Sequence, residues 1–238
     1  NYLRAMEACS VNTVEIGFRF IDAKENIGPY GVSDEEFLAS LNLPSSLNYA
    51  VMINGKEYLS IDEEKLKDQV GKNFLPSRES CISMVRIAIN FNDALDSRPI
   101  LKELKDLGYE IGLNLMQSNG KKETEYEKIA KEIQSWDLVD VLYFADSFGN
   151  MDPKEVNLII KSLKRGWQGK LGFHSHDNKG FALINSLQAI DSDIAFCDAT
   201  VKGMGRGAGN VSTESLLMEL QNRGTIEDDL SLIQGTVS

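Results

Sequence analysis

The chain has 238 residues, of which 42% are hydrophobic and 26% charged, a composition typical of globular proteins and not of disordered or fibrous ones. Acidic side chains outnumber basic ones by 36 to 25, and the net charge of −11 argues against nucleic acid or a membrane surface as a partner, because both are anionic. No apolar run approaches the roughly 20 residues that span a bilayer. The three cysteines are far apart, which does not suit a disulfide framework and predicts a cytoplasmic protein (Cys9, Cys81 and Cys197).

Seven short runs rich in apolar and β-branched residues predict strands. Each is followed by a stretch with helical spacing, and successive runs begin roughly 30 residues apart, the length of a strand, a helix and two short loops. This rhythm predicts a parallel sheet built from βα units. In chain order the runs are residues 13–18, 49–53, 82–89, 109–115, 138–144, 170–174 and 194–201.

Local signals mark where the connecting helices begin and end. Residues 33–36, Ser-Asp-Glu-Glu, have the pattern of a capping box, and Pro153 after Asp152 suits the first position of a helix. Gly108 and Gly166 follow the apolar periodicity of their helices, where we expect a glycine in the left-handed region. The chain opens with an amphipathic stretch, residues 2–9, that we expect to be helical.

Seven βα units without a change of rhythm favour a (β/α)8 TIM barrel over an open doubly wound sheet, which commonly has five or six strands. No linker rich in Pro, Gly or Ser interrupts the sequence, so we expect a single α/β domain over residues 1–238. A barrel of this type has eight strands, and removing one would expose two edges. We therefore expect the first strand to precede Asn1 and the chain to be truncated at its N-terminus.

Both histidines of the chain lie in one tripeptide, His174-Ser175-His176, at the end of the sixth predicted strand. Side chains at i and i+2 of a strand point to the same side, so the two imidazoles would project together into the barrel mouth as neighbouring ligands of a divalent metal. Barrel enzymes also place their catalytic groups at the C-terminal ends of strands. For an isolated pair of this kind, two partly exposed histidines without a ligand are the competing interpretation.

A glycine-rich loop, Lys-Gly-Met-Gly-Arg-Gly-Ala-Gly-Asn at residues 202–210, follows the last predicted strand. Its backbone amides, those of Gly205 and Gly207 among them, can approach an anionic or carbonyl ligand closely. The spacing also matches the dinucleotide fingerprint, but the βαβ unit that this motif requires does not follow. Lys202 offers an alternative, a metal-free aldolase that forms a Schiff base, with the pKa of the lysine lowered by apolar neighbours. That alternative leaves both histidines without a role.

Other polar residues collect at the ends of the predicted strands, where a barrel would bring them together. Each alone is compatible with a solvated rim position or a salt bridge in the core, but together they make a mouth rich in carboxylate, guanidinium and amide groups. Such a mouth suits an oxyacid substrate on a metal with oxygen and nitrogen ligands. The residues are Glu15, Arg19, Arg86, Asn90, Asn114, Gln117, Asp146, Ser147, Asp198 and Thr200.

Four blocks of the sequence resemble the metal-dependent lyase and aldolase barrels, a family that includes 4-hydroxy-2-oxovalerate aldolase, 3-hydroxy-3-methylglutaryl-CoA (HMG-CoA) lyase and isopropylmalate synthase. They are residues 14–17 (Val-Glu-Ile-Gly), 145–149 (Ala-Asp-Ser-Phe-Gly), 172–178 (Gly-Phe-His-Ser-His-Asp-Asn) and 198–210, which end with the glycine-rich loop. The glycine-rich loop looks closest to the hydroxy-oxoacid aldolase branch.

The resemblance implies a divalent cation, Mn²⁺ or Mg²⁺, bound by His174 and His176, with Asn210 as a further ligand or near neighbour. The family's remaining ligand is an aspartate in an Arg-Asp motif at the end of the first barrel strand, and this motif is absent from the sequence. By the same resemblance, we expect catalytic roles at Glu15, Arg86 and Asp146. Residues expected to bind substrate are Arg19, Asn114, Ser147, Gly205 and Gly207.

The activity that the resemblance implies is that of a carbon-carbon lyase acting on a small oxoacid. Chelation of the 2-oxo and carboxylate oxygens of a 4-hydroxy-2-oxoacid would polarise the carbonyl, so that breaking the C3–C4 bond leaves an enolate whose charge the ion stabilises. The products would be pyruvate, or a related 2-oxoacid, and an aldehyde. The alternatives are an acyl-CoA condensing enzyme like isopropylmalate synthase, an enzyme like HMG-CoA lyase, and a barrel without catalysis. A homo-oligomer and a partner aldehyde dehydrogenase, which some aldolases of the family use, are left open.

Overall fold

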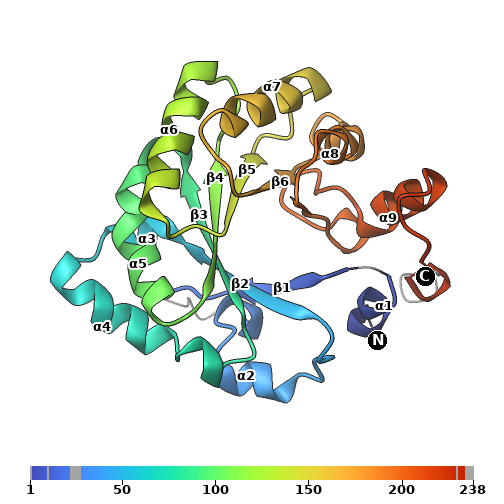
Figure 1. Ribbon diagram of the computed structural model, residues 1–238. Helices are drawn as coiled ribbons and strands as arrows, with labels where there is room; N and C mark the ends of the chain where they lie inside the picture. Colours follow the sequence, from blue (N-terminus) through green and yellow to red (C-terminus); the bar gives the residue numbers. More distant parts are fainter. Residues whose placement is uncertain (1, 10, 22–27, 229, 234–238) are drawn as a thin grey trace.

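The structure, a computed structural model, describes residues 2–9, 11–21, 28–228 and 230–233. The described part of the chain contains one sheet of seven parallel strands, which pair in the order in which they occur in the sequence (Figure 1). Parallel neighbours in sequential order require a crossover after every strand, as the predicted βα units provide. The strands are β1 (Thr13–Phe18), β2 (Asn48–Asn54), β3 (Met84–Asn90), β4 (Glu110–Met116), β5 (Val141–Asp146), β6 (Lys170–Ser175) and β7 (Phe196–Cys197).

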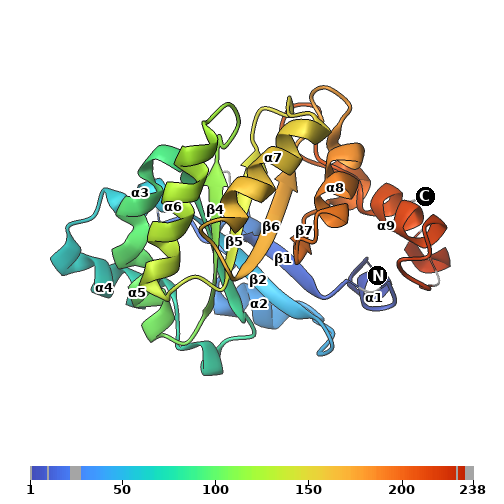
Figure 2. The same cartoon turned by 45° about the horizontal axis from the view of Figure 1, so that its top comes forward.

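Helices lie around the outside of the curled sheet, as the two views in Figures 1 and 2 show. Within the described residues, none of them combines the length and the apolar character that crossing a bilayer requires. The helices are α1 (Tyr2–Glu7), α2 (Glu35–Ser40), α3 (Gly55–Leu59), α4 (Glu63–Asn73), α5 (Arg98–Asp106), α6 (Glu123–Trp136), α7 (Pro153–Lys164), α8 (Ala182–Asp191) and α9 (Thr213–Asn222).

The sheet curls so far that its first and last strands line the same interior. A cavity of about 160 Å³ at the N-terminal ends of the strands is lined by Thr13 of β1 and Phe196 of β7, together with residues from β2, β3, β4 and β6. Among the described residues, β1 pairs with β2 alone and β7 with β6 alone, so hydrogen bonds do not close the sheet. The fold is therefore TIM-barrel-like, and an additional strand before Asn1 stays a prediction.

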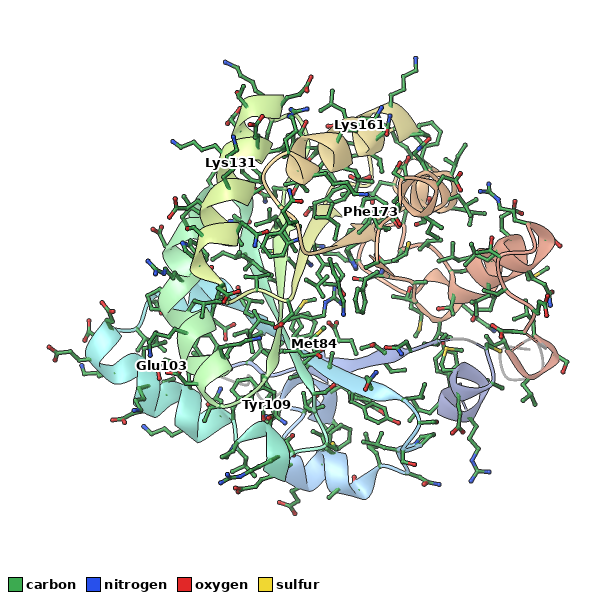
Figure 3. The ribbon with its side chains drawn as sticks, viewed as in Figure 1. Met84, Glu103, Tyr109, Lys131, Lys161 and Phe173 are labelled. Atoms are coloured by element: carbon green, nitrogen blue, oxygen red, sulfur yellow. The ribbon has the colours of Figure 1, made fainter. Side chains whose placement is uncertain are left out.

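The two faces of the sheet carry different side chains. The outer face holds the main hydrophobic core, in which every second residue of the central strands packs against the helices, for example Val51, Ile87, Leu113, Phe144 and Phe173. Figure 3 shows Phe173 within the protein, whereas Lys131 and Lys161 extend from the exposed faces of α6 and α7. The apolar cluster on the inner face is much smaller, which leaves room there for polar groups (Ala50, Met84, Val141 and Tyr143).

The observed strands agree with the predicted runs except at the end of the sheet. Residues 194–201 were expected to form one strand, but β7 spans only Phe196–Cys197. The backbone N–H of Asp198 still donates to the carbonyl of Phe173, at 3.0 Å, and beyond it Thr200 pairs with Ser212 through an isolated bridge. The chain thus leaves the sheet early because its partner after Asp198 is the segment that follows the glycine-rich loop.

Three of the local signals can be compared with the structure directly. Gly108 has a φ of +89°, as expected after α5, but Gly166 is not in the left-handed region. A Cβ at Gly166 would lie 2.5 Å from the backbone oxygen of Glu127, so close packing against α6 explains this glycine. The cap of α2 is Asp34, which accepts a hydrogen bond from the backbone of Phe37, and not the first residue of the predicted capping box.

Candidate active site

Two glycines make room for a stacked guanidinium and ring inside the barrel. Arg86 on β3 lies in register with Gly112 on β4, where a Cβ would lie 3.0 Å from Cγ of Arg86 and 3.3 Å from Cε2 of Tyr143. At Gly172 on β6, a Cβ would lie 2.2 Å from Cδ1 of Tyr143. The guanidinium carbon of Arg86 consequently lies 4.3 Å from the centre of the Tyr143 ring, within cation–π range.

Arg86 joins two carboxylates that come from distant parts of the chain. Its Nη1 donates to Oε2 of Glu15 at 2.9 Å, and its Nη2 donates to Oδ2 of Asp198. The arginine is 5% exposed, so both ion pairs form largely out of water. An arginine with two carboxylate partners has a well-defined orientation and in turn orients both of them.

Burial and charge affect the two carboxylates differently. Burial raises the pKa of Glu15, an effect that the charge of Arg86 only partly offsets. At Asp198 burial also acts to raise the pKa, but the charge of Arg86 and the hydrogen bond with His174 outweigh it, so the pKa of Asp198 lies below its usual range. Two carboxyl groups whose pKa values are pushed apart are suited to different roles in proton transfer.

The two histidines lie beside this group of charges. Nδ1 of His174 is 3.0 Å from Oδ2 of Asp198, the same oxygen that accepts from Arg86. The rings of His174 and His176 are 5.1 Å apart and nearly perpendicular. Burial, followed by the proximity of His174, lowers the pKa of His176. A histidine with a lowered pKa is neutral at physiological pH, which is the form that binds metals.

The glycine-rich loop holds Asn210 next to His176. These two residues pair through an antiparallel bridge, and the Asn210 side chain donates to the backbone oxygen of Met204 at 3.0 Å. A Cβ at Gly205 would lie 2.5 Å from Nδ2 of Asn210, and one at Gly209, whose φ is +91°, would lie 2.1 Å from the backbone oxygen of Gly203. The glycines therefore let the loop fold tightly around the asparagine. Oδ1 of Asn210 is buried and has no hydrogen-bond partner among the described residues.

Asn114 and Gly207 remain candidates for substrate contact. Asn114 on β4 is 3% exposed and lies in register with Tyr143, and its Oδ1 has no partner within the described part of the chain. Gly207 is exposed, with a φ of +69°, and a Cβ there would lie 3.3 Å from Nδ2 of Asn178. Both roles stay predictions.

A β-bulge separates Glu15 from Arg19, which a regular strand would place on one face. Glu15 on β1 pairs with Ala50 on β2. The next residue of β2, Val51, pairs with Gly17, so the register skips one residue of β1. One extra residue on β1 reverses the alternation of all later side chains. Arg19 therefore points to the helix side of the sheet, away from the interior that contains Glu15.

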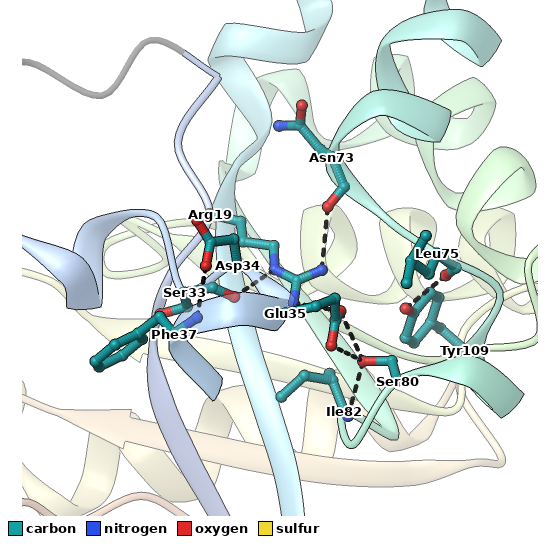
Figure 4. A network of polar contacts seen from close by, with 10 residues as sticks. All are labelled: Arg19, Ser33, Asp34, Glu35, Phe37, Asn73, Leu75, Ser80, Ile82 and Tyr109. Carbon is teal, nitrogen blue, oxygen red and sulfur yellow. Dashed lines mark hydrogen bonds and ion pairs between the residues drawn. The ribbon is translucent and has the colours of Figure 1, made fainter. Parts of the chain in front are cut away.

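Figure 4 shows the separate network that Arg19 forms on the helix side. Its Nε donates to the carbonyl of Ser33 at 2.8 Å, Nη1 to the carbonyl of Asn73 at 3.1 Å, and Nη2 to Glu35 at 2.8 Å. The guanidinium also lies over the ring of Phe74. Arg19 is 2% exposed, and these contacts join the end of β1 to α2 and α4 rather than to the interior.

Asp146 and Ser147 also hold the backbone of loops at the ends of strands. The two oxygens of Asp146 accept from the backbone N–H groups of Asn150 and Met151, each at 3.0 Å, and the residue is fully buried. Ser147 Oγ accepts from the backbone of Gln117 at 2.8 Å. Since Asp146 pairs with Ser175 on β6 while its neighbour Ala145 pairs with His174, the carboxylate lies on the opposite face from the imidazole.

Lys202 does not have the environment that a Schiff-base lysine requires. Its side chain is exposed, its φ is +51°, and its backbone N–H donates to the carboxylate of Glu214. An exposed ammonium is well hydrated, and the apolar pocket expected around this lysine is not present.

Two residues of the interior had no assigned role in the sequence. In the sequence, Asp198 is one of several polar residues at strand ends, and Tyr143 is one residue of a predicted strand. The sequence signal for Tyr143 is the two-residue period of a strand. Tyr143 lies two residues before Ala145 and so shares its face of the sheet, and Ala145 pairs with His174. The signal for Asp198 is weak, because its partners are distant in the sequence.

The side chains around His174 and His176 offer a partial set of metal ligands. Asn210 adds a buried amide oxygen without a partner, while the described residues contain no group of three or more His, Cys, Asp or Glu side chains arranged to hold a metal. Two imidazoles and one amide oxygen suit a divalent cation that retains open positions for water or substrate. The residues present therefore fit such an ion.

Comparison with known proteins identifies the family. The model of the HMGL-like family matches residues 78–235, which include β3 to β7, both histidines and the glycine-rich loop. The chain belongs to the HMGL-like family.

Curated relatives of this HMGL-like chain are named as aldolases. A 4-hydroxy-2-oxovalerate aldolase of Geobacillus genomosp. 3 is 35% identical over 163 residues, which are 68% of this chain and 48% of the relative. One of Carboxydothermus hydrogenoformans is 31% identical over 192 residues, which are 76% of this chain and 57% of the relative. The chain thus spans about half the length of the curated relatives it matches.

Solved structures support the fold of the HMGL-like chain. The N-terminal domain of a candidate aldolase from Bacteroides vulgatus has a TM-score of 0.84 and 31% identity, over 99% of this chain and 76% of that one. An HMG-CoA lyase from Brucella melitensis has a TM-score of 0.74 and 16% identity, over 99% and 87% of the two chains. At 16% identity the likeness concerns the fold alone.

Proposed function

We propose that this chain forms the barrel of a divalent-metal-dependent aldolase that cleaves a 4-hydroxy-2-oxoacid into pyruvate, or a related 2-oxoacid, and an aldehyde. The observation that carries the proposal is the interior where two imidazoles and a partnerless amide oxygen lie beside two carboxylates joined by Arg86. The name shared by relatives at 30–36% identity supports the same reaction.

In this proposal His174, His176 and Asn210 hold Mn²⁺ or Mg²⁺. When bound, the ion would act as a Lewis acid on the 2-oxo group and stabilise the negative charge that develops as the C3–C4 bond breaks. The net charge of the adjacent group also favours a cation, because Glu15 and Asp198 carry two carboxylates against the single positive charge of Arg86.

The cleavage needs a group that moves a proton. The bonding pair of C3–C4 stays with C3, the 4-hydroxyl loses its proton as C4 becomes the aldehyde carbon, and C3 finally takes up a proton. We assign proton transfer to Glu15, whose carboxyl faces the interior and whose pKa is raised by burial. Because both terminal nitrogens of Arg86 already bind carboxylates, its proposed role is to orient Glu15 and not to bind the substrate. Asn114, with its partnerless oxygen, is the proposed contact for the substrate.

The test is Mn²⁺ binding by calorimetry, followed by pyruvate release from 4-hydroxy-2-oxovalerate on the same samples. We expect binding to disappear in the His174→Ala/His176→Ala variant, and pyruvate release by the wild type to require the metal. Asn210→Ala should weaken binding, whereas Asn222→Ala, at an exposed asparagine of α9, should leave it unchanged. A wild type that binds no divalent ion contradicts the proposal. Metal binding without pyruvate release would direct the assignment to acyl-CoA condensation or to HMG-CoA cleavage.

A further inference from the structure

One carboxylate oxygen connects the arginine to the first histidine. Oδ2 of Asp198 accepts from Nη2 of Arg86 and lies 3.0 Å from Nδ1 of His174. The backbone holds the residue in place, because the N–H of Asp198 donates to the carbonyl of Phe173, immediately before His174 on the neighbouring strand. Asp198 is therefore positioned from both its side chain and its main chain.

An ionised carboxylate can only accept hydrogen bonds, which determines how the imidazole is protonated. A neutral imidazole carries one hydrogen, and the nitrogen that faces Asp198 must hold it if the contact is to be a hydrogen bond. The lone pair is then on Nε2 of His174. A metal binds the nitrogen that has the lone pair, and metal-binding histidines commonly donate their other N–H to a carboxylate.

We propose that Asp198 is a positioning residue, which keeps the hydrogen of His174 on Nδ1 and so presents Nε2 to the divalent cation. The inference rests on the metal site of the proposed function. Arg86 supports the arrangement, since its contacts with Glu15 and Tyr143 leave Nη2 aimed at Asp198.

The two histidines differ in this respect. His176 pairs with Asn210 of the glycine-rich loop through a backbone bridge, the N–H of the next residue, Asp177, donates to the carbonyl of Gly209, and among the described residues it is His174 whose ring faces Asp198. These backbone contacts tie the position of His176 to the folding of that loop. The two ligands are thus oriented by independent parts of the structure, and a change at Asp198 should affect His174 alone.

The direct test is ¹⁵N NMR of the metal-free protein, labelled at histidine, at about pH 8, where an ordinary imidazole is neutral. The chain has only two histidines, so the spectrum contains two imidazoles. We expect His174 to carry its hydrogen on Nδ1 in the wild type. In Asp198→Asn, whose amide group can donate toward Nδ1, we expect the Nε2–H form to increase, with His176 unchanged. A wild-type His174 with its hydrogen on Nε2 overturns the inference without any variant.

The second measurement is the affinity for Mn²⁺. Loss of a carboxylate partner from a metal-binding histidine typically weakens binding by roughly 10- to 100-fold, and we expect this for Asp198→Asn. Asp140→Asn is the matched control, because Asp140 also pairs with a cation, Lys105, and accepts from a backbone N–H, but does not contact either histidine. We expect it to leave the Mn²⁺ affinity and the histidine spectrum unchanged.

The outcomes separate this inference from the proposed function. If Asp198→Asn keeps both the wild-type tautomer and the wild-type Mn²⁺ affinity, the inference is wrong even where pyruvate is released. If the tautomer and the affinity change as expected but the wild type releases no pyruvate, the proposed reaction fails and the positioning role of Asp198 stands.

Discussion

Arg19 and Arg86 are both buried and both paired with carboxylates, yet they lie on opposite faces of one sheet and have different partners. Arg19 donates to two backbone carbonyls and one carboxylate, so it joins separate segments of the chain. Arg86 donates to two carboxylates and stacks on an aromatic ring, so it organises charge in the interior. Burial and ion pairing are common to both arginines, and the nature of their acceptors is what distinguishes them.

Arg86→Met has the largest expected effect on this comparison. It leaves Glu15 and Asp198 without their cation, and breaking a buried ion pair in this way costs about 3–5 kcal/mol of the free energy of unfolding. An unpaired buried carboxyl group has a raised pKa in the folded protein. The stability that it contributes is therefore present below about pH 4 and is lost as the pH rises through this folded-state pKa. Urea unfolding should therefore show the greatest deficit at pH 7 and a smaller one near pH 4. A variant as stable as the wild type at pH 7 would contradict the central role of Arg86.

Arg19→Met should cost less, about 2 kcal/mol, because Glu35 is partly exposed and can be hydrated when its partner is removed. The carbonyls of Ser33 and Asn73 account for most of the loss. Urea unfolding measures this cost, and calorimetry should show a Mn²⁺ affinity equal to that of the wild type. Arg19→Lys is the control that keeps the charge and restores part of the stability. A large loss of Mn²⁺ affinity would show that the two arginines are not independent.

Gly17→Ala tests the bulge that sends Arg19 to the helix side. The new Cβ would lie 2.2 Å from the backbone oxygen of Tyr30 and 2.8 Å from Oγ of Ser33, so we expect a loss of about 1–2 kcal/mol from overpacking. The matched control is Gly71→Ala in α4, where nothing lies within 4 Å of the new Cβ and alanine should stabilise the helix by about 0.5–1 kcal/mol. Thermal or urea unfolding should show opposite signs for the two variants, and equal signs would exclude this explanation of the bulge.

Glu15→Gln has the smallest expected effect, and its sign follows from the pKa. Because burial raises the pKa of Glu15, the stability that its carboxyl group contributes is present below about pH 4 and is lost as the pH rises through the folded-state value. The glutamine does not ionise, so the variant should gain stability relative to the wild type between pH 4 and pH 8.

Glu127→Gln is the contrasting control for this pH dependence. Hydrogen bonds from Lys131 and Arg165 lower the pKa of Glu127, so its contribution is present above about pH 4 and lost as the pH falls. The stability of Glu127→Gln relative to the wild type should therefore decline between pH 4 and pH 8. Urea unfolding across this range measures both trends, and a parallel response of the two variants would refute the assigned environment of Glu15.

Much of the fold follows from local patterns. Six of the seven strands lie within about three residues of their predicted positions because an apolar β-branched run and the polar turn after it are features of adjacent residues. The proximity of the two imidazoles follows from the same period of two residues, and the Asp152 cap of α7 from a local hydrogen bond. The predicted strand at 194–201 was too long because its pairing partners are not local.

The candidate site was less predictable. Glu15 and Arg86 are 71 residues apart in the chain, and Arg86 and Asp198 are 112 apart, so no sequence spacing indicates that one arginine joins both carboxylates. Asp146 has a residue type and position typical of a barrel catalyst, but its oxygens bind the backbone of the next loop. A carboxylate at a strand end is compatible with either use, and only the path of the following loop distinguishes them.

Periodicity, turn chemistry and the His-x-His and glycine-rich motifs are thus properties of adjacent residues, and they are sufficient for the succession of βα units and for the family to which the chain belongs. Other features depend on the register of the strands and on a single bulge in β1. They are the face on which Arg19 lies, the pairing of Arg86 with two carboxylates, and the contact between Asp198 and His174. A shift of one residue exchanges the two faces of a strand, so these features are defined only when neighbouring strands pair and the sheet curls to bring distant residues together.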